Sequence, residues 1–335
     1  MGQSKPSKAK PGVADAIRSG DRVALARAIT LVESAKPEDQ LAAQALIETL
    51  LPYTGKSIRV GISGVPGAGK STLIDQLGLN LVGQGHKVAV LAVDPTSSRS
   101  GGSILGDKTR MGRLATEPSA FIRPSPAGDS LGGVTKTTRE TINLAEAAGY
   151  DVVLVETVGV GQSETAVSNM VDIFVVVALP GAGDELQGIK RGLLELADII
   201  AVNKTDGDNI ERALRAAVEY KTGLHILAAG NPGWSPSVLT VSAKENTGLD
   251  ELWNKIKERH AEIAGCGDLA RRRAEQAVQW MREIFEQRLL TNFKGSRQAA
   301  RQWHEMEEKV RAGELSPGAA AEQLSRLTTG DPKKS

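Results

Sequence analysis

The sequence predicts an α/β fold, in which a mostly parallel sheet is covered by helices on both faces. Short runs rich in valine and isoleucine recur along the centre of the 335-residue chain. Most of them lack polar alternation, as expected for strands buried on both faces. Helical stretches separate the runs, which is the order of elements typical of parallel sheets. The predicted strands are 57–62, 88–93, 151–156, 172–179, 198–203 and 237–242.

The N-terminal part is predicted to be helical after a flexible leader. Residues 13–51 are rich in alanine and leucine at helical spacing, as in VALARAITLVE and LAAQALIETLL. Pro37 should divide this stretch into two helices, because proline interrupts a helix but is tolerated in its first turn. We therefore assign residues 1–55 to a leader with N-terminal helices and residues 56–265 to the α/β domain.

From about Cys266 the strand pattern stops, and residues 266–335 are predicted to form a helical arm. Segments 268–293 and 297–312 have the pattern of charged amphipathic helices. Ser316-Pro317 should open a last short helix, since serine and proline are favoured at helix starts.

Composition argues against several classes of protein. Hydrophobic residues make up 40% and charged residues 24% of the chain, and the formal net charge is +1, so nothing favours nucleic acid or an acidic membrane as partner. The single cysteine cannot form an internal disulfide. The longest aliphatic stretch, 173–179, is too short to span a bilayer. These features favour a cytoplasmic protein.

The first predicted strand leads directly into the loop GVPGAGKS and a helix, which is the setting of a phosphate-binding P-loop. Glycines let backbone N–H groups turn toward the phosphates, and the helix N-terminus adds its positive end. Lys70 would contact the β- and γ-phosphates as a catalytic charge, and the Ser71 hydroxyl would bind Mg²⁺. The predicted phosphate-binding residues are Gly64, Val65, Pro66, Gly67, Ala68, Gly69, Lys70, Ser71 and Thr72.

The strand 198–203 ends in the NKxD pattern of guanine-binding proteins, at Asn203, Lys204 and Asp206. Guanine offers a ring N–H and an amine side by side, and a carboxylate such as Asp206 accepts both. Adenine presents a lone pair at the equivalent ring position, and a site built on such pairing rejects the wrong partner by about 10⁴-fold or more. Asn203 would tie loops together, and the Lys204 stem would lie against the base.

A second base-contacting element follows the last predicted strand. Ser242, Ala243 and Lys244 form an SAK turn, which can aim the backbone N–H of Ala243 at the guanine carbonyl. Taken with the P-loop, the order of these motifs predicts GTP and GDP as the nucleotides.

Acidic residues at strand ends are candidates for the metal site, because ligands bind at the carboxyl ends of parallel strands. Asp94 and Asp107 follow the strand 88–93 within a glycine- and serine-rich stretch, and Asp94 is also a catalytic candidate. Glu156 ends the strand 151–156, and Gly159 would offer its backbone N–H to the γ-phosphate.

The residue that orients the attacking water is left open. Many small GTPases have glutamine directly after the glycine, where this chain has Val160, so intrinsic turnover should be slow. Gln162 with Glu164 is one alternative. The other is the loop PGAGDELQGIKRG, which contains the catalytic candidates Gln187 and Lys190, although these could equally form a polar helix start.

Together these motifs resemble the GTPases associated with methylmalonyl-CoA mutase, the MeaB/ArgK family of P-loop GTPases. The resemblance covers residues 15–330 and is carried by GVPGAGKS, VDPTS, GGSILGDKTRM, ETVGVGQSE, GAGDELQGIK, NKTD and SAKENTG. It implies a homodimer that acts as a chaperone of an adenosylcobalamin-dependent mutase, guarding it from inactivation and gating cofactor loading or release.

The resemblance also implies roles for particular residues. Ser71, Asp94, Asp107 and Glu156 would form the Mg²⁺ site. GAGDELQGIK would be a third switch that senses the partner. The C-terminal helices would be a dimerisation arm, and direct binding of cobalamin by this chain is not expected.

Three other readings stay open. A nickel-delivery GTPase of the same branch would need soft or imidazole ligands, whereas the four histidines are scattered and the one cysteine is alone. A phosphotransferase acting on transport proteins would need a base that positions the acceptor, and usually ATP. A scaffold would bind GTP without hydrolysing it.

Overall fold

The computed structural model describes residues 11–93, 111–124, 131–157, 163–180, 191–228, 236–295 and 297–328. The predictions for Asp94, Asp107, Gly159, Val160, Gln162, Gln187 and Lys190 therefore lie outside the described residues. The chain forms two compact units, Met1–Ala274 and Glu275–Ser335.

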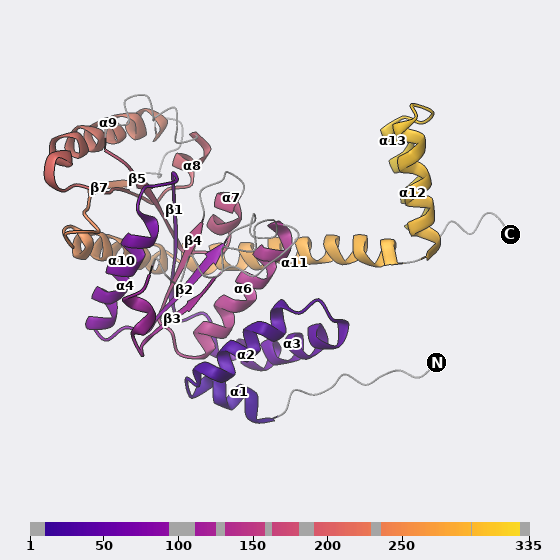
Figure 1. The fold of residues 1–335 in the computed structure, drawn as a ribbon, viewed down its shortest axis with the longest axis horizontal. Coiled ribbons are helices and arrows are strands. Elements are labelled where there is room, and N and C mark those ends of the chain that lie inside the picture. Colours follow the sequence, from indigo (N-terminus) through magenta and orange to yellow (C-terminus); the bar gives the residue numbers. More distant parts are fainter. Residues whose placement is uncertain are drawn as a thin grey trace. The chain divides into compact units, whose positions relative to one another are not determined.

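The first unit contains a parallel seven-stranded sheet with the order β3-β2-β4-β1-β5-β6-β7 (Figure 1). The strands are β1 (Ile58–Gly64), β2 (Val88–Val93), β3 (Ala120–Arg123), β4 (Val152–Thr157), β5 (Ile173–Ala178), β6 (Ile199–Val202) and β7 (Ser237–Thr240). The helices of this unit that follow β1 are α4 (Lys70–Gly83), α6 (Leu131–Ala147), α7 (Ser163–Ser168), α8 (Arg191–Glu195), α9 (Ile210–Ala228) and α10 (Leu249–Gly265). The predicted fold class is thus confirmed, and the edge strand β3 is an addition to it.

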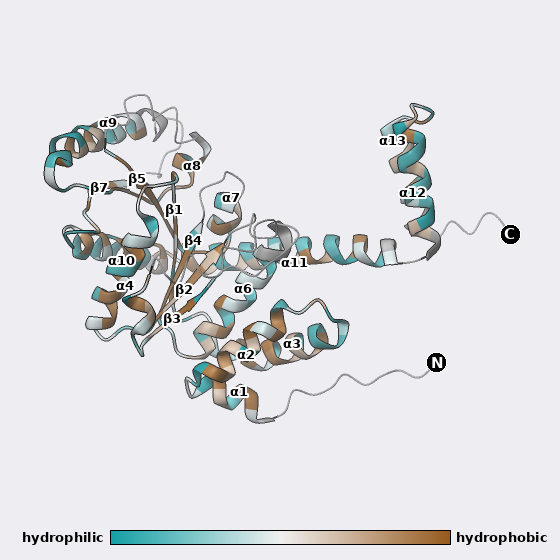
Figure 2. Ribbon diagram, in the orientation of Figure 1, coloured by the Kyte–Doolittle hydropathy of each residue, from teal (hydrophilic) through white to brown (hydrophobic). Residues whose placement is uncertain are grey.

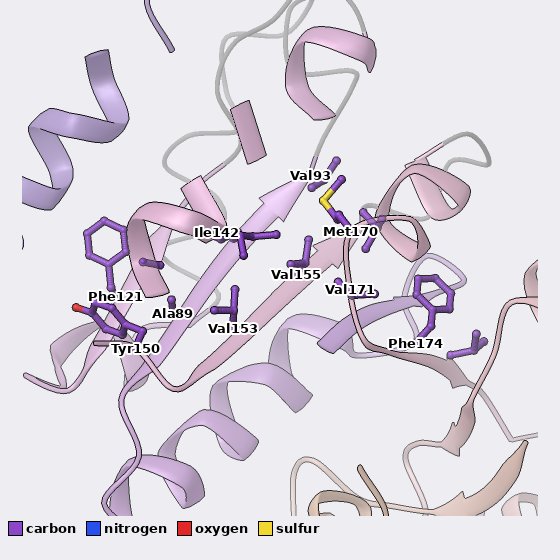
Figure 3. Packing of buried hydrophobic residues seen from close by; sticks show 14 of the residues in the cluster. Ala89, Val93, Phe121, Ile142, Tyr150, Val153, Val155, Met170, Val171 and Phe174 are labelled. Atoms are coloured by element: carbon purple, nitrogen blue, oxygen red, sulfur yellow. The ribbon is translucent and has the colours of Figure 1, made fainter. Parts of the chain in front are cut away.

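The core consists of two layers, one on each face of the sheet. Successive residues of β4 alternate between them: Val153 and Val155 belong to one hydrophobic cluster, and Val152 and Leu154 to the other. Because both faces are covered, the central strands are mostly apolar, and β2 and β5 are so over their whole length (Figure 2). Figure 3 shows the first layer, where Val153 and Val155 lie near Ile142 of α6.

The N-terminal stretch forms three helices rather than the predicted two: α1 (Pro11–Arg18), α2 (Arg22–Glu33) and α3 (Pro37–Leu50). Gly20 adopts φ +83°, and Asp21 caps α2 by accepting hydrogen bonds from the backbone N–H groups of Val23 and Ala24. The additional break follows from this glycine and cap. Pro37 does open a helix, in its first turn. Helices α2 and α3 pack on α6 (Figure 1).

A buried ionic network ties the start of α11 (Asp268–Gly295) to the amino ends of the strands. Asp172, which directly precedes β5, is fully buried, and its Oδ1 and Oδ2 accept hydrogen bonds from Arg273 Nε and Nη2 at 2.8 and 2.6 Å. Beside it, Glu146 accepts two bonds of 2.8 Å from Arg59 and one of 2.5 Å from the Ser57 hydroxyl. Buried carboxylates require such pairing, so the network fixes the root of α11.

The second unit contains the rest of α11 together with α12 (Arg297–Arg311) and α13 (Pro317–Thr328), close to the predicted helices. Phe293 and Trp303 pack edge to face with ring centroids 6.2 Å apart. By contrast, α11 exposes a row of large apolar side chains. They are Val278, Met281, Phe285, Leu289 and Leu290. Among the residues that the structure describes, no helix is both long and apolar enough to cross a membrane.

Candidate nucleotide and metal site

The phosphate loop begins at Gly64, where β1 runs beside β5. Gly64 has φ +145°, and a Cβ atom there would lie 2.1 Å from the carbonyl oxygen of Val177, so only glycine fits. Gly69 adopts φ +85° and leads into α4, which begins at Lys70. The local sequence thus produces a sharp turn from a buried strand into a helix N-terminus, which is a favourable place for phosphate.

The Lys70 side chain lies over this loop. Its Nζ donates to the carbonyl oxygens of Gly64 at 2.9 Å and Val65 at 3.2 Å, and the residue is only 7% exposed. The ammonium group is therefore held at the loop in a largely desolvated setting, where its attraction to phosphate is stronger than in water.

The candidate metal site lies between α4 and the end of β4. Ser71 Oγ donates a hydrogen bond of 2.8 Å to Glu156 Oε1, and Glu156 is buried. Among the described residues there is no group of three or more histidine, cysteine, aspartate or glutamate side chains that could hold a metal ion. One hydroxyl and one carboxylate fit Mg²⁺, which prefers oxygen ligands and takes few of them from the protein, using phosphates and water for the rest.

Asn203 joins the phosphate loop to the predicted base-reading turn. It is 2% exposed; its Nδ2 donates to the Ala68 carbonyl oxygen at 2.8 Å, and its Oδ1 accepts from the Ala243 N–H at 3.1 Å. A Cβ atom on Gly69 would lie 2.6 Å from Asn203 Nδ2, so this bridge leaves room only for glycine there. One buried amide therefore fixes the spacing between the two loops.

The carboxylate of Asp206 is oriented by the SAK turn. Ser242 Oγ donates a 2.5 Å hydrogen bond to Asp206 Oδ2, and the backbone N–H of Thr205 donates to the Val241 carbonyl oxygen at 3.1 Å. Since a carboxylate has about four lone-pair positions, the serine bond leaves capacity for the two donors of guanine. Lys204 adopts a left-handed conformation with φ 62°, which is uncommon outside glycine and is found at functional turns.

A second link between α4 and the base-reading turn was not predicted. Asn80 and Asn246 exchange side-chain hydrogen bonds, with Nδ2 to Oδ1 distances of 2.8 and 3.2 Å. Asn246 has φ +53°, a conformation that asparagine tolerates better than most residues. Its position within the SAKENTG motif was the available signal in the sequence.

The structure therefore brings together Lys70, Ser71, Glu156, Asn203, Asp206, Ser242 and Ala243, near the carboxyl ends of four parallel strands. Glu164, the alternative water-orienting residue, is buried at the start of α7.

Comparison with known proteins gives consistent matches over most of the chain. The sequence model of the family described as methylmalonyl-CoA mutase-associated GTPase MeaB matches residues 25–298. A probable GTPase of Mycobacterium tuberculosis is 52% identical over 327 residues, covering 98% of this chain and 97% of that protein. The GTPase ArgK of Escherichia coli is 47% identical over 311 residues, covering 93% and 94% of the two chains.

Two further similarities extend these matches. A mouse protein described as the mitochondrial methylmalonic aciduria type A homolog is 47% identical over 315 residues, covering 91% of this chain and 76% of that protein. A crystal structure described as an LAO/AO transport system kinase has a TM-score of 0.74 and 40% identity, covering 95% and 97% of the two chains. The family model and these relatives agree with the P-loop and the NKxD motif. The chain belongs to the MeaB family of methylmalonyl-CoA mutase-associated GTPases.

Proposed function

We propose that the protein is a Mg²⁺-dependent GTPase that acts as a chaperone of adenosylcobalamin-dependent methylmalonyl-CoA mutase. GTP binding and hydrolysis would be coupled to cofactor loading or release and to protection of the mutase. The observation that carries the nucleotide assignment is the Asn203 bridge from the Ala68 carbonyl to the Ala243 N–H, beside the Ser242–Asp206 bond. The mutase assignment is supported by the family description.

In this proposal Asp206 accepts the ring N–H and the amine of guanine. Ser242 keeps the carboxylate in the orientation that this pairing needs. In the structure the Ala243 N–H already donates to Asn203 Oδ1, so a guanine carbonyl would share this donor. Base recognition is thus built from groups whose positions are fixed before the nucleotide binds, which reduces the ordering cost of binding.

At the phosphate end, Lys70 would pass from the Gly64 and Val65 carbonyl oxygens to the β- and γ-phosphates. Ser71 and Glu156 would hold Mg²⁺, with Asp94 and Asp107 proposed as further ligands. Bound Mg²⁺ would neutralise charge that develops on the phosphates. The Gly159 N–H would contact the γ-phosphate, and Gln187 or Lys190 would assist hydrolysis.

Intrinsic hydrolysis should be slow, on the order of 10⁻² s⁻¹ or less, because Val160 occupies the usual position of the water-orienting glutamine. The mutase would complete or order the catalytic groups and so raise this rate.

The single cysteine, Cys266, is free, so the protein does not need an oxidising compartment, and we propose that it acts in the cytoplasm.

We further propose that the C-terminal helices form a homodimer. The row of exposed apolar side chains on α11 supports this, because Met281 and Phe285 are 61% and 60% exposed. Large apolar groups gathered on one helix face mark an interaction surface more often than chance. The chain itself is not proposed to bind cobalamin.

One alternative has an observation in its favour, since a relative of known structure is described as a transport system kinase. A kinase would transfer the γ-phosphate to a protein, whereas a GTPase releases it to water. Nickel delivery has less support, because the described residues contain no cluster of histidine and cysteine suited to a metal ion.

The test is hydrolysis of γ-labelled GTP by the full chain with and without purified methylmalonyl-CoA mutase, at fixed Mg²⁺. We expect slow release of labelled phosphate, faster release with the mutase, and little release from ATP. Labelled protein in place of free phosphate would favour the kinase, and equal use of ATP would overturn the guanine assignment. An unchanged rate across a mutase titration, with no capture of the mutase by GTP-loaded protein, would refute the chaperone role.

A further inference from the structure

A buried hydrogen bond joins two hydroxyl groups of neighbouring strands at the carboxyl end of the sheet. Thr157 Oγ1 donates to Ser63 Oγ at 2.8 Å, and both residues are 0% exposed. Ser63 lies in β1 and Thr157 is the last residue of β4, which runs parallel to β1. A hydroxyl group buried away from water is costly unless it is hydrogen-bonded, so burial favours this bond.

The bond continues the register of the two strands by one position. The residue pairing between β1 and β4 extends to Ile62 and Glu156. Ser63 and Thr157 are the next residues of the two strands, and their side chains form the contact there. The hydroxyl pair therefore holds the last residues of β1 and β4 together beyond the end of that register.

Each hydroxyl belongs to a residue that is the direct neighbour of a site residue in the chain. On β4, Thr157 follows Glu156, whose Oε1 accepts the 2.8 Å hydrogen bond from Ser71 Oγ. On β1, Ser63 precedes Gly64, the first residue of the phosphate loop. A change in the distance between the two strand ends would therefore move the Glu156 carboxylate relative to the phosphate loop.

The hydroxyl pair and the carboxylate lie on opposite faces of the sheet. Successive side chains of a strand point to opposite faces. Val155, two positions before Thr157, belongs to the hydrophobic layer that Figure 3 shows. Glu156 points to the other face, where it contacts Ser71 of α4. The carboxylate is thus held by Ser71 on one face, and its strand is held by the bond to Ser63 on the other.

We propose that Ser63 and Thr157 are positioning residues of the nucleotide and Mg²⁺ site. Their hydrogen bond sets the distance between the phosphate loop and the Glu156 carboxylate, and neither hydroxyl touches the ion or the nucleotide. A metal ligand that is held in place before the ion binds loses less conformational freedom on binding. The inference rests on the proposed function, because it presupposes a site that binds Mg²⁺ together with GTP.

The alternative is a purely structural role, in which the bond only satisfies two buried hydroxyl groups. Ser57 is the matched control, because it is a buried serine that directly precedes β1 and is 2% exposed. Its Oγ donates a 2.5 Å hydrogen bond to Glu146 Oε1, by the amino ends of the strands. Ser57→Ala should therefore lower stability without changing the response to Mg²⁺.

The experiment titrates Mg²⁺ into the full chain with a fluorescent nonhydrolysable GTP analogue and measures the half-saturating Mg²⁺ concentration. For Thr157→Val and Ser63→Ala we expect it to rise about fivefold, less than the roughly tenfold or more seen when a group bonded directly to a metal ligand is changed. The effect is smaller because the hydroxyl pair acts through the main chain. Binding of a fluorescent GDP in excess chelator should stay within about twofold of the wild type, since the guanine contacts are intact.

Two further variants separate the hydrogen bond from the general effects of substitution. Thr157→Ser keeps the hydroxyl group and should respond to Mg²⁺ within about twofold of the wild type. The double variant Ser63→Ala, Thr157→Val should shift as far as one substitution does and not by the product of the two, because both remove the same bond. It also keeps the inference testable if a single variant does not fold, because removing both partners leaves no unpaired hydroxyl group.

Wild-type Mg²⁺ dependence in Thr157→Val and Ser63→Ala would overturn the inference, as would an equal shift in Ser57→Ala or in Thr157→Ser. A double variant that shifts by the product of the two single shifts would also overturn it, because the two hydroxyl groups would then act independently. Nucleotide binding by the wild type that is indifferent to Mg²⁺ would overturn the proposed function as well. A wild type that responds to Mg²⁺ with variants that match it refutes the role of the hydroxyl pair alone.

Discussion

Ser71 Oγ and Glu156 Oε1 lie 2.8 Å apart in a hydrogen bond that joins the first turn of α4 to the carboxyl end of the buried strand β4. The serine follows Lys70 directly, so its position is set by the start of α4. Glutamate at a strand end and serine at a helix start thereby bring a carboxylate and a hydroxyl oxygen to one point.

We expect Glu156→Gln and Ser71→Ala to weaken Mg²⁺-dependent nucleotide binding by about 10- to 100-fold, since each removes or weakens a proposed oxygen ligand. The measurement is the Mg²⁺ concentration needed for half-maximal binding of a fluorescent GTP analogue. Ser19→Ala, at an exposed serine after α1, is the control. A wild-type titration curve for both variants would contradict the assignment.

Asp206→Asn should weaken GTP binding by roughly a hundredfold, because two charge-assisted hydrogen bonds to guanine are worth about 3 kcal/mol or more. The new amide donates, so it should pair better with xanthine, which has a carbonyl group in place of the 2-amino group. Competition between GTP and xanthosine triphosphate, measured by calorimetry, distinguishes the two effects.

Asp208→Asn is the matched control for this prediction, because Asp208 is an exposed acid two positions further on. It should bind GTP as the wild type does. Equal GTP affinity in Asp206→Asn would remove the basis of the guanine assignment.

Lys70→Ala should abolish measurable hydrolysis, since it removes the buried charge that is proposed to move onto the β- and γ-phosphates. Single-turnover release of phosphate from bound GTP is the appropriate measurement, because it separates chemistry from binding. Lys221→Ala, at an exposed position of α9, serves as control. An unchanged rate in Lys70→Ala would exclude the proposed role of the loop.

The buried carboxyl group of Glu146 should make the stability of the protein depend on pH. Burial, the largest single influence, raises the pKa of Glu146, but the hydrogen bonds and charge of Arg59, with the bonds from Ser57 and Gly55, outweigh it and leave the pKa below its usual 4.5. A carboxyl whose pKa is lowered in the folded state contributes stability above its unfolded pKa and loses it as the pH falls below that value.

Glu146→Gln should therefore be less stable than the wild type at pH 7, by about 3 kcal/mol, the scale on which loss of one partner of a buried ion pair destabilises a protein. The difference should shrink as the pH falls below about 4.5, where the unfolded wild type takes up the proton. Urea unfolding at several pH values measures it, with Glu211→Gln on the exposed face of α9 as control. A difference that stays constant down to pH 3 would contradict the lowered pKa.

Met281→Glu combined with Phe285→Glu should dissociate the proposed homodimer, because charges would replace apolar side chains on the exposed face of α11. Sedimentation velocity at micromolar protein concentration measures the change from dimer to monomer directly. Gln287→Glu adds a charge two positions beyond Phe285, on another side of the helix, and should leave association unchanged. A monomeric wild type, or a dimer that survives the double substitution, would exclude this face as the interface.

The sequence predicts six of the seven strands, most clearly β2, β4 and β5, whose residues are all buried and mostly apolar. It misses β3, whose four residues, AFIR, include only two buried side chains and end in arginine. This edge strand forms because it pairs with β2, and its own four residues show no pattern of apolar residues that would predict a strand. The start of the last helix was predictable from Ser316-Pro317, since Pro317 is the first residue of α13.

Within the candidate site, motifs identify the residues that β1, β4 and β6 carry to one edge of the sheet, although their roles stay predictions. Contacts made by buried side chains outside the motifs could not be identified this way. Asp75 is an isolated acid in the helical run TLIDQLG, yet its Oδ1 accepts a hydrogen bond from the backbone N–H of Leu114, 39 positions away. Contacts of that kind depend on how the chain returns to α4, which no local pattern specifies.

Gly69 shows how the phosphate loop and the SAK turn constrain each other. Its neighbour in space is the Asn203 amide rather than a group that binds phosphate. A larger residue at this position would displace that amide and so change the distance between the phosphate loop and the SAK turn, which the amide joins. Under the proposed function, a substitution at Gly69 should therefore relax the choice between guanine and adenine nucleotides. A Gly69 variant is accordingly tested by its nucleotide preference and not by its phosphate affinity alone.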